Sequence, residues 1–213
     1  MAGLYIHIPF CTQKCIYCDF MSGTNLSLRQ DFVASLIAEM DHYLDFFDSD
    51  PMRTIYFGGG TPSLLSVDEL QRIYDAIAQR WDISAVEEFT IECNPDDLSE
   101  EYLQRLCSLS INRLSIGVQS FCDDELQWLN RRHTSQEAFD AVRRAQKAGF
   151  ENITIDLMFA LPVQTLESLN YSISKALELG VQHISAYSLM FEPDSKITKL
   201  MELNRLQPLD EDV

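Results

Sequence analysis

The sequence predicts an α/β fold in which a parallel sheet is built from six strand–helix units. Three observations support this fold class: short apolar or alternating runs typical of strands, glycine or proline turns that follow them, and longer amphipathic runs with helical spacing. Consecutive parallel strands are joined by right-handed crossovers. Two architectures fit this alternation, an open doubly wound sheet and a curved TIM-like barrel of six units that stays open on one side.

The six expected strands are short and rich in β-branched, aromatic and aliphatic residues. The first alternates from residue to residue, and the second ends directly in three glycines. The expected strands span residues 4–8, 54–60, 88–93, 113–119, 152–159 and 183–189.

Helical sequence follows each of the first five strands. Ser66 and Glu69 form a plausible capping box at the start of the second helix. Gly149 and Gly180 stand where two helices should end, because glycine readily adopts the left-handed conformation of a helix terminus. The expected helices span residues 28–47, 66–81, 96–109, 123–129, 135–149 and 165–180.

Composition favours one cytoplasmic domain over residues 1–213. The chain is 46% hydrophobic, has no shift in composition, and contains no apolar run long enough for a membrane span. A basic leader with a small-residue cleavage site is missing from its N-terminus. The formal net charge of −17 argues against nucleic acid as a partner. Residues 208–213 resemble the start of a helix that is cut off, so we expect an N-terminal fragment of a longer protein.

The most informative segment is the stretch that follows the first strand. Cys11, Cys15 and Cys18 are three of the six cysteines in the chain. In a reducing compartment such a cluster predicts metal binding or catalysis in preference to disulfides. Zinc sites usually take four ligands, and His7 is the candidate for a fourth. Three thiolates also suit a cubane iron–sulfur cluster with one open iron, which could bind a substrate.

Six sequence blocks then carry a family resemblance. They are YIHIPFCTQKCIYCDF, YFGGGTPSLL, IECNPD, RLSIGVQSF, LNRRH and IDLMFALPVQT, in this order along nearly the whole chain. The cysteine spacing resembles the signature of the radical S-adenosylmethionine (SAM) superfamily. Together the blocks resemble the anaerobic coproporphyrinogen III oxidase group and, within it, the haem-chaperone branch. Phe20 distinguishes the branches, because the oxidases typically carry a further cysteine at that position.

The resemblance implies a fold, two cofactors and a chemistry. The fold is the radical SAM core, a partial TIM-like (β/α)6 barrel. A [4Fe-4S] cluster would be held by Cys11, Cys15 and Cys18, and its fourth iron would chelate the methionine part of SAM. In the superfamily, one electron through the cluster cleaves the sulfonium and yields a 5′-deoxyadenosyl radical. The cofactor carries that chemistry, and the protein supplies position and electrostatics.

Further residues are candidates for SAM contacts. Glu92 ends a strand and could accept hydrogen bonds from ribose hydroxyls or from an ammonium group. Asp156 interrupts an apolar strand, where a lone carboxylate is costly unless it is paired or liganded. Arg132 is the alternative to Arg131 within the arginine pair, and His133 is expected at the surface. The complete set of expected cofactor-binding residues is Tyr5, Tyr17, Gly59, Gly60, Thr61, Glu92, Gln119, Arg131 and Asp156.

The leading hypothesis is a haem chaperone that binds haem and transfers it to an acceptor protein, with an electron donor serving the cluster. The main alternative is oxygen-independent decarboxylation of the propionates of coproporphyrinogen III, a porphyrinogen substrate. A zinc-binding or purely structural cysteine module is a third hypothesis. A radical SAM enzyme that acts on RNA is the fourth, and the acidic composition disfavours it.

Overall fold

The computed structural model describes residues 2–47, 50–193 and 195–203. Within them a single six-stranded parallel sheet runs through the molecule. Its strands are Ala2–Ile8 (β1), Met52–Gly59 (β2), Glu88–Cys93 (β3), Arg113–Gln119 (β4), Asn152–Phe159 (β5) and His183–Ser188 (β6). The α-helices are Arg29–Met40 (α1), Val67–Arg80 (α2), Glu100–Leu106 (α3), Asp123–Trp128 (α4), Ser135–Lys147 (α5), Leu166–Leu179 (α6) and Lys196–Glu202 (α7).

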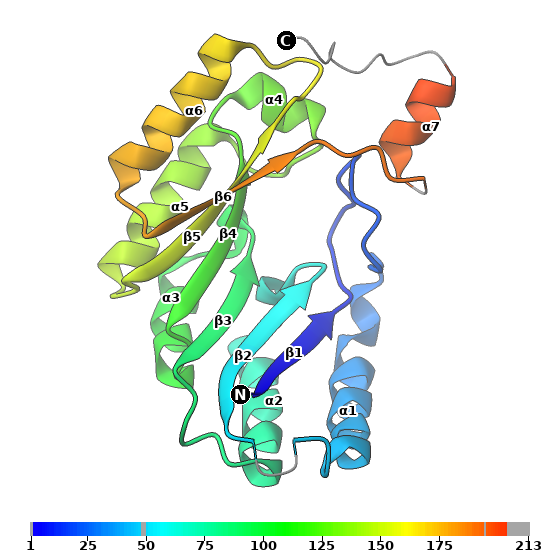
Figure 1. Ribbon diagram of the computed structural model, residues 1–213, viewed down its shortest axis with the longest axis vertical. Coiled ribbons are helices and arrows are strands. Elements are labelled where there is room, and N and C mark those ends of the chain that lie inside the picture. The colour runs from blue at the N-terminus through cyan, green and yellow to red at the C-terminus, as the bar shows by residue number, and fades with distance from the viewer. Residues whose placement is uncertain (1, 48–49, 194, 204–213) are drawn as a thin grey trace.

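The order of the strands decides between the two architectures. Each strand pairs with the one before it in the chain, from β1 through β6, as Figure 1 shows. A doubly wound sheet would instead reverse direction at a switch point and place strands on both sides of the first. The outermost strands β1 and β6 each have one neighbour, so the barrel is open. The partial TIM-like barrel of six units is therefore confirmed.

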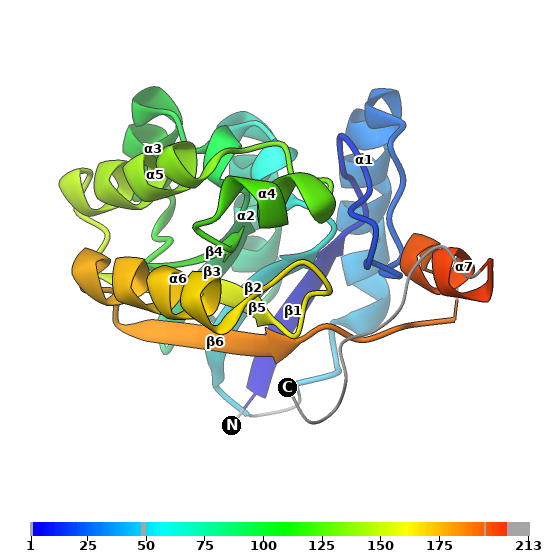
Figure 2. The same cartoon turned by 90° about the horizontal axis from the view of Figure 1, so that it is seen from above.

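The two faces of the sheet differ in chemistry. Helices α1, α2, α3, α5 and α6 cover one face, as the two views in Figures 1 and 2 agree. That face buries apolar side chains such as Phe57, Ile91 and Leu114 against the helices. Because side chains alternate along a strand, the other face receives polar residues that include Tyr56 and Glu92. The inner face of this partial barrel is thus polar and available for a ligand.

The sequence signals for helix ends are confirmed in the structure. The Ser66 hydroxyl accepts from the Glu69 amide at 3.2 Å, and the Ser66 amide donates to the Glu69 carboxylate at 2.8 Å. Gly149 and Gly180 follow α5 and α6 with φ of +103° and +64°. Both angles lie where residues with a β-carbon are strained, so glycine is the natural terminator.

One expected helix is shorter than its sequence pattern. The run 28–47 forms α1 only as far as Met40, and a short 3-10 turn follows. The helix ends there because Phe47 packs edge-on against Trp81, with ring centroids 5.5 Å apart. Arg80 holds the same turn through Asp41 at 2.7 Å. A tertiary contact, which local spacing cannot reveal, therefore overrides the helical pattern.

The end of the chain is partly described. The described part of the tail contains the short helix α7, whereas the expected helix start at 208–213 lies outside the described residues. None of the helices in the described part of the chain combines the length and apolar character needed to cross a bilayer. The prediction of a single domain over 1–213 stays a prediction.

Candidate functional site

The three cysteines lie on one loop at the carboxyl end of β1. The loop is closed at its base, because the Cys11 amide donates to the Gly23 carbonyl and the Gly23 amide donates to the Pro9 carbonyl, both at 2.9 Å. Cys11 is buried, and Cys15 and Cys18 are half-buried. Residues 9–23 therefore form a closed loop that presents its thiols at the edge of the sheet where the parallel strands end.

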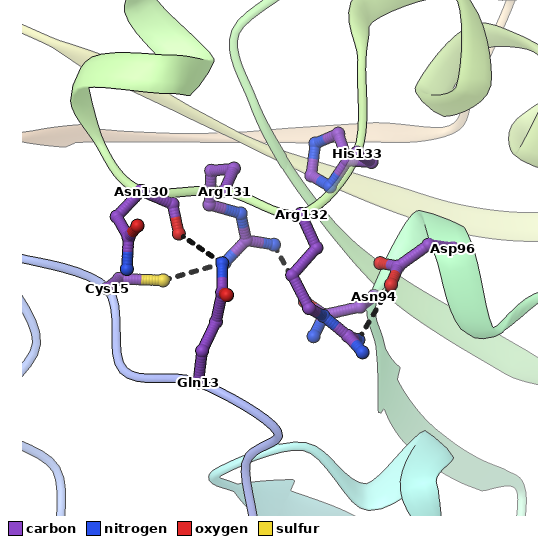
Figure 3. Close-up of a pocket in the computed structure, with 8 residues that line it drawn as sticks. All are labelled: Gln13, Cys15, Asn94, Asp96, Asn130, Arg131, Arg132 and His133. Carbon is purple, nitrogen blue, oxygen red and sulfur yellow. Dashed lines mark hydrogen bonds and ion pairs between the residues drawn. The ribbon is translucent and has the colours of Figure 1, made fainter.

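The connection between α4 and α5 is hydrogen-bonded to this loop. The Gln13 side chain donates to the Asn130 carbonyl, and the Asn130 side chain donates to the Lys14 carbonyl, each at 2.9 Å. Figure 3 shows Gln13, Cys15 and Asn130 gathered on this side of a small polar pocket. Ile16 is buried in a separate apolar cluster with Leu129 and others. The cysteine loop is thus fixed to the rest of the barrel by polar and apolar contacts.

The donor set fits an iron–sulfur cluster better than a single ion. Among residues 2–47, 50–193 and 195–203, no three His, Cys, Asp or Glu side chains converge to hold one metal ion. A cubane does not require such convergence, since each thiolate binds a different iron. Three soft thiols on one closed loop therefore fit a [4Fe-4S] cluster. His7 points elsewhere, because its ring is hydrogen-bonded to the Met21 carbonyl at 2.8 Å.

The glycine run at the end of β2 lies directly against the start of the cysteine loop. Gly59 has φ of +111°, and a β-carbon there would lie 2.6 Å from the His7 ring. A β-carbon on Gly60 would lie 2.6 Å from the Phe10 carbonyl oxygen. Gly59 and Gly60 were expected to contact SAM; close approach of the chain itself already requires glycine at both positions. Thr61 then donates its hydroxyl to Cys11 Sγ at 3.6 Å.

Glu92 is anchored on the inner face by two donors. Its carboxylate accepts from the Tyr56 hydroxyl at 2.7 Å and from the Gly59 amide at 3.0 Å. Burial raises the pKa of Glu92, although both hydrogen bonds oppose that shift. Tyr5 stacks on Tyr56 with ring centroids 5.9 Å apart and remains 56% exposed. The aromatic ring of Tyr5 is therefore free to contact a ligand.

Asp156 shares the inner face with Glu92. Burial, followed by the negative charge of Glu92, raises the pKa of Asp156 to about 6. The Ser185 hydroxyl on the neighbouring strand donates to Asp156 and partly offsets this effect. Two desolvated carboxylates on one polar face suit the recognition of hydroxyl or ammonium groups.

Gln119, the last residue of β4, and Arg131 lie close together. Gln119 is buried and has φ of +69°, next to an irregularity in the pairing of β4 with β5. A β-carbon on Gly117 would lie 3.0 Å from Gln119 Nε2 and 3.3 Å from Arg131 Nη2. Because Gly117 has no side chain, the side chains of Gln119 and Arg131 can both pack next to it at the irregular end of the strand.

The structure separates the two arginines of the pair. Arg131 donates to Cys15 Sγ at 3.3 Å, and Figure 3 shows its guanidinium directed toward that sulfur. Arg132 turns the other way and forms ion pairs with Asp96 and Asp97 at 2.9 and 3.0 Å. Of the two arginines, Arg131 is therefore the one that lies at the cysteine loop.

Tyr17 lies between the last two cysteines and is half-buried against the same apolar cluster as Ile16. It is hydrogen-bonded to Cys15, and burial is the main reason that its pKa is raised. This position fits a residue that shields the sulfurs from water.

The expectation of a surface position for His133 is wrong. Its side chain is only 3% exposed, and Nε2 donates to the Val118 carbonyl at 3.0 Å. Burial lowers the pKa of His133 to about 4, so the ring is neutral at pH 7. The Val118 carbonyl is distant in sequence from this histidine, and no local pattern indicates the contact.

Two further polar residues at the site were not singled out from the sequence. Tyr56 positions Glu92, and Asn94 accepts from Arg131 Nη2 at 2.7 Å. The available signal for Asn94 was its place directly after a strand, in the block IECNPD. Tyr56 shares a face with Glu92 through the alternation of side chains along neighbouring strands.

A curved parallel sheet with a closed C-x3-C-x2-C loop at its carboxyl edge defines a radical SAM protein. The family described as the radical SAM superfamily matches residues 5–176, and the chain belongs to that superfamily. This membership implies a [4Fe-4S] cluster and SAM as cofactors.

The curated relatives include haem chaperones named HemW. The chain is 46% identical to HemW of Lactococcus lactis over 192 residues, which are 88% of the chain and 49% of that protein. It is 43% identical to HemW of Bacillus subtilis over 208 residues, 97% of the chain and 55% of the relative. The chain thus spans about half the length of these relatives.

Solved structures agree with the fold. Coproporphyrinogen III oxidase (HemN) from Escherichia coli, described as a radical SAM enzyme, superposes with a TM-score of 0.82 at 27% identity. The match covers 94% of this chain and 51% of that one. Elp3 of Methanocaldococcus infernus, at 16% identity and a TM-score of 0.67, supports the fold alone.

Proposed function

We propose that this chain is the cluster- and SAM-binding part of a haem chaperone, which binds haem and transfers it to an acceptor protein. The observation that carries the proposal is the 43–46% identity to two HemW haem chaperones over most of the chain. Phe20, in place of a further cysteine, supports the same branch. The proposal includes an electron donor for the cluster and a cytoplasmic location. It does not include nucleic acid as a partner.

Cys11, Cys15 and Cys18 are the proposed cluster ligands. Two neighbouring side chains support this assignment, because Thr61 donates to Cys11 Sγ and Arg131 donates to Cys15 Sγ. Hydrogen bonds to the sulfurs and a nearby positive charge stabilise thiolates and tune the reduction potential of a cluster. When bound, the cluster supplies the electron that cleaves the sulfonium of SAM.

The proposed SAM contacts surround the cysteine loop on the inner face. Glu92 and Asp156 provide acceptors for hydroxyl and ammonium groups, and Arg131 provides a planar donor for a carboxylate. The open ring of Tyr5 provides an aromatic surface. Gly59, Gly60 and Thr61 offer backbone groups at the end of β2, while Gln119 lies beside Arg131 and Tyr17 lies beside Cys15.

Haem transfer is the test of the proposed function. The protein is purified and reconstituted anaerobically, loaded with haem, and mixed with a haem-free acceptor, and absorbance spectra of the separated proteins follow the haem. The proposal expects haem bound to the protein to move to the acceptor. Failure to bind haem, with the cluster assembled, would contradict the chaperone function.

Oxidative decarboxylation is the second candidate function. The observation in its favour is the TM-score of 0.82 to coproporphyrinogen III oxidase. Incubation of the reconstituted protein with coproporphyrinogen III, SAM and a reductant distinguishes the two. Sustained formation of protoporphyrinogen would favour the oxidase over the chaperone. Zinc in a colourless anaerobic preparation, without iron or sulfide, would favour the structural cysteine module.

A further inference from the structure

A continuous path of hydrogen bonds connects Cys11 and Cys15, two of the proposed cluster ligands, by way of Thr61, Asn94 and Arg131. Cys11 Sγ accepts from Thr61 Oγ1 at 3.6 Å, and Thr61 Oγ1 accepts from Asn94 Nδ2 at 3.4 Å. Asn94 Oδ1 accepts from Arg131 Nη2 at 2.7 Å, and Arg131 Nη1 donates to Cys15 Sγ at 3.3 Å. Asn94 is the midpoint of this path.

We propose that Asn94 is a positioning residue for the iron–sulfur cluster, acting through Thr61 on Cys11 and through Arg131 on Cys15. The inference rests on the proposed function, because it concerns the same cysteines. Asn94 itself bonds to no sulfur. Its role is to fix the two donors that do.

The chemistry of the amide explains why asparagine suits this position. Thr61 has one hydroxyl hydrogen, which it donates to Cys11, so toward Asn94 its oxygen can only accept a hydrogen bond. Arg131 is a donor only and needs an acceptor on its other side. A primary amide provides both an N–H₂ donor and a C=O acceptor. A carboxylate at position 94 would serve Arg131 and would draw the Thr61 hydroxyl away from Cys11.

The side chain of Asn94 is also uncharged, unlike that of an aspartate. Within the described residues, no carboxylate lies within ion-pair distance of Arg131. Its remaining partner is the Gly117 carbonyl at 2.6 Å, which is also uncharged. Asp96 and Asp156 interact with Arg131 only at longer range, so no directly paired carboxylate competes with the sulfur of Cys15 for its positive charge. An aspartate at position 94 would neutralise that charge.

The backbone of Asn94 is held independently of the cysteine loop. Its amide donates to Ser63 Oγ at 3.1 Å, and Ser63 donates to Asp97 at 2.7 Å. Asp97 is in turn paired with Arg132. Asn94 follows directly after β3, so the sheet fixes one end of this segment. A side chain that bridges two donors from such a support can hold them without moving itself.

The test uses Asn94→Asp, which keeps the shape of the side chain and changes its charge and donor capacity. The matched control is Asn112→Asp, which makes the same chemical change. The Asn112 side chain likewise bridges a donor and an acceptor, here the Phe89 amide and the Glu87 carbonyl of the backbone, but it lies at the opposite end of the sheet. Both variants and the wild type are reconstituted anaerobically. Iron loss to a chelator and the midpoint potential are then measured.

We expect Asn94→Asp to lose iron about 10-fold faster than the wild type, since support of metal ligands from surrounding residues is typically worth at least that much. We also expect a more negative midpoint potential, because negative charge is added and a hydrogen bond to sulfur is lost. Asn112→Asp should match the wild type in both. A merely structural role of Asn94 would not shift the potential relative to this control.

If the aspartate variant folds poorly, Asn94→Ala is measured in its place. It removes both links without adding charge, so we expect faster iron loss with a smaller shift in potential. Wild-type iron retention and potential in both Asn94 variants would overturn the inference and leave the proposed function standing. Failure of the wild type itself to assemble a cluster would overturn both.

Discussion

Replacement of Asp156 by asparagine is expected to stabilise the protein in the absence of SAM. Asp156 lies on the inner face of β5, where burial and the charge of Glu92 disfavour its ionised form. The hydroxyl of Ser185 is a hydrogen-bond partner that an amide at position 156 can retain. The substitution therefore removes a costly charge while it keeps the shape of the side chain and its contact.

The size of the effect follows from the pKa. A shift from 3.8 to about 6 costs the ionised carboxylate in the folded protein about 3 kcal/mol. Between pH 4 and pH 6 the folded state binds more protons than the unfolded state, so the stability of the wild type falls as the pH rises. The stability of Asp156→Asn does not fall in this way, because an amide at position 156 does not ionise. Its advantage should reach about 2–3 kcal/mol above pH 7 and shrink toward pH 4.

Thermal unfolding of both proteins from pH 4 to pH 8 measures this difference. A gain of 1 kcal/mol raises the melting temperature of a chain of this size by about 2–4 °C. Asp140→Asn is the control, because Asp140 is exposed on α5 and its removal should change little at any pH. A pH-independent difference, or a variant less stable than the wild type at pH 8, would refute the account of a desolvated carboxylate.

Three further predictions concern the same region. Tyr56→Phe removes a donor that lowers the pKa of Glu92, so carboxylate NMR should show Glu92 titrating at a higher pH than in the wild type. Gly59→Ala combines φ of +111° with a β-carbon 2.6 Å from the His7 ring, and denaturant unfolding should show a loss of about 2 kcal/mol or more. Ile16→Ala truncates a buried side chain and should cost about 2–4 kcal/mol, with faster exchange of the Ile197 amide that donates to the Ile16 carbonyl.

Each of these predictions has a clear contrary outcome. An unchanged Glu92 titration in Tyr56→Phe would mean that the hydroxyl does not hold the carboxylate. Gly23→Ala is the control for Gly59→Ala, because a β-carbon at Gly23 meets nothing within 4 Å. Equal stability of these two alanine variants would exclude the proposed crowding. Unchanged exchange of the Ile197 amide in Ile16→Ala would show that the loop does not depend on its apolar cluster.

Local chemistry made most of the fold predictable. The six strands and the helix ends at Ser66 and Gly180 follow from side-chain spacing and from residues with special backbone preferences. The choice of a barrel over a doubly wound sheet did not follow from residue patterns, because both have alternating strands and helices. The family resemblance implied the barrel, and the strand order confirms it. The early end of α1 depends on Phe47 meeting Trp81, which is a contact between distant segments.

The candidate site was predictable where residues stand at the ends of strands. Glu92 and Asp156 could be selected because charged groups in or after apolar strands need partners. Asn94 and His133 were harder, because their significance lies in contacts with Thr61, Arg131 and a strand backbone far away in the sequence. The roles of the expected ligand residues in binding cluster and SAM stay predictions.

Electron paramagnetic resonance of the reduced, reconstituted protein, recorded with and without SAM, tests the central claim most directly. If three cysteines hold a cubane with one iron open, addition of SAM changes the signal of the reduced cluster. A [4Fe-4S] signal that SAM leaves unaltered, or an anaerobic preparation that never acquires the cluster, would contradict the account.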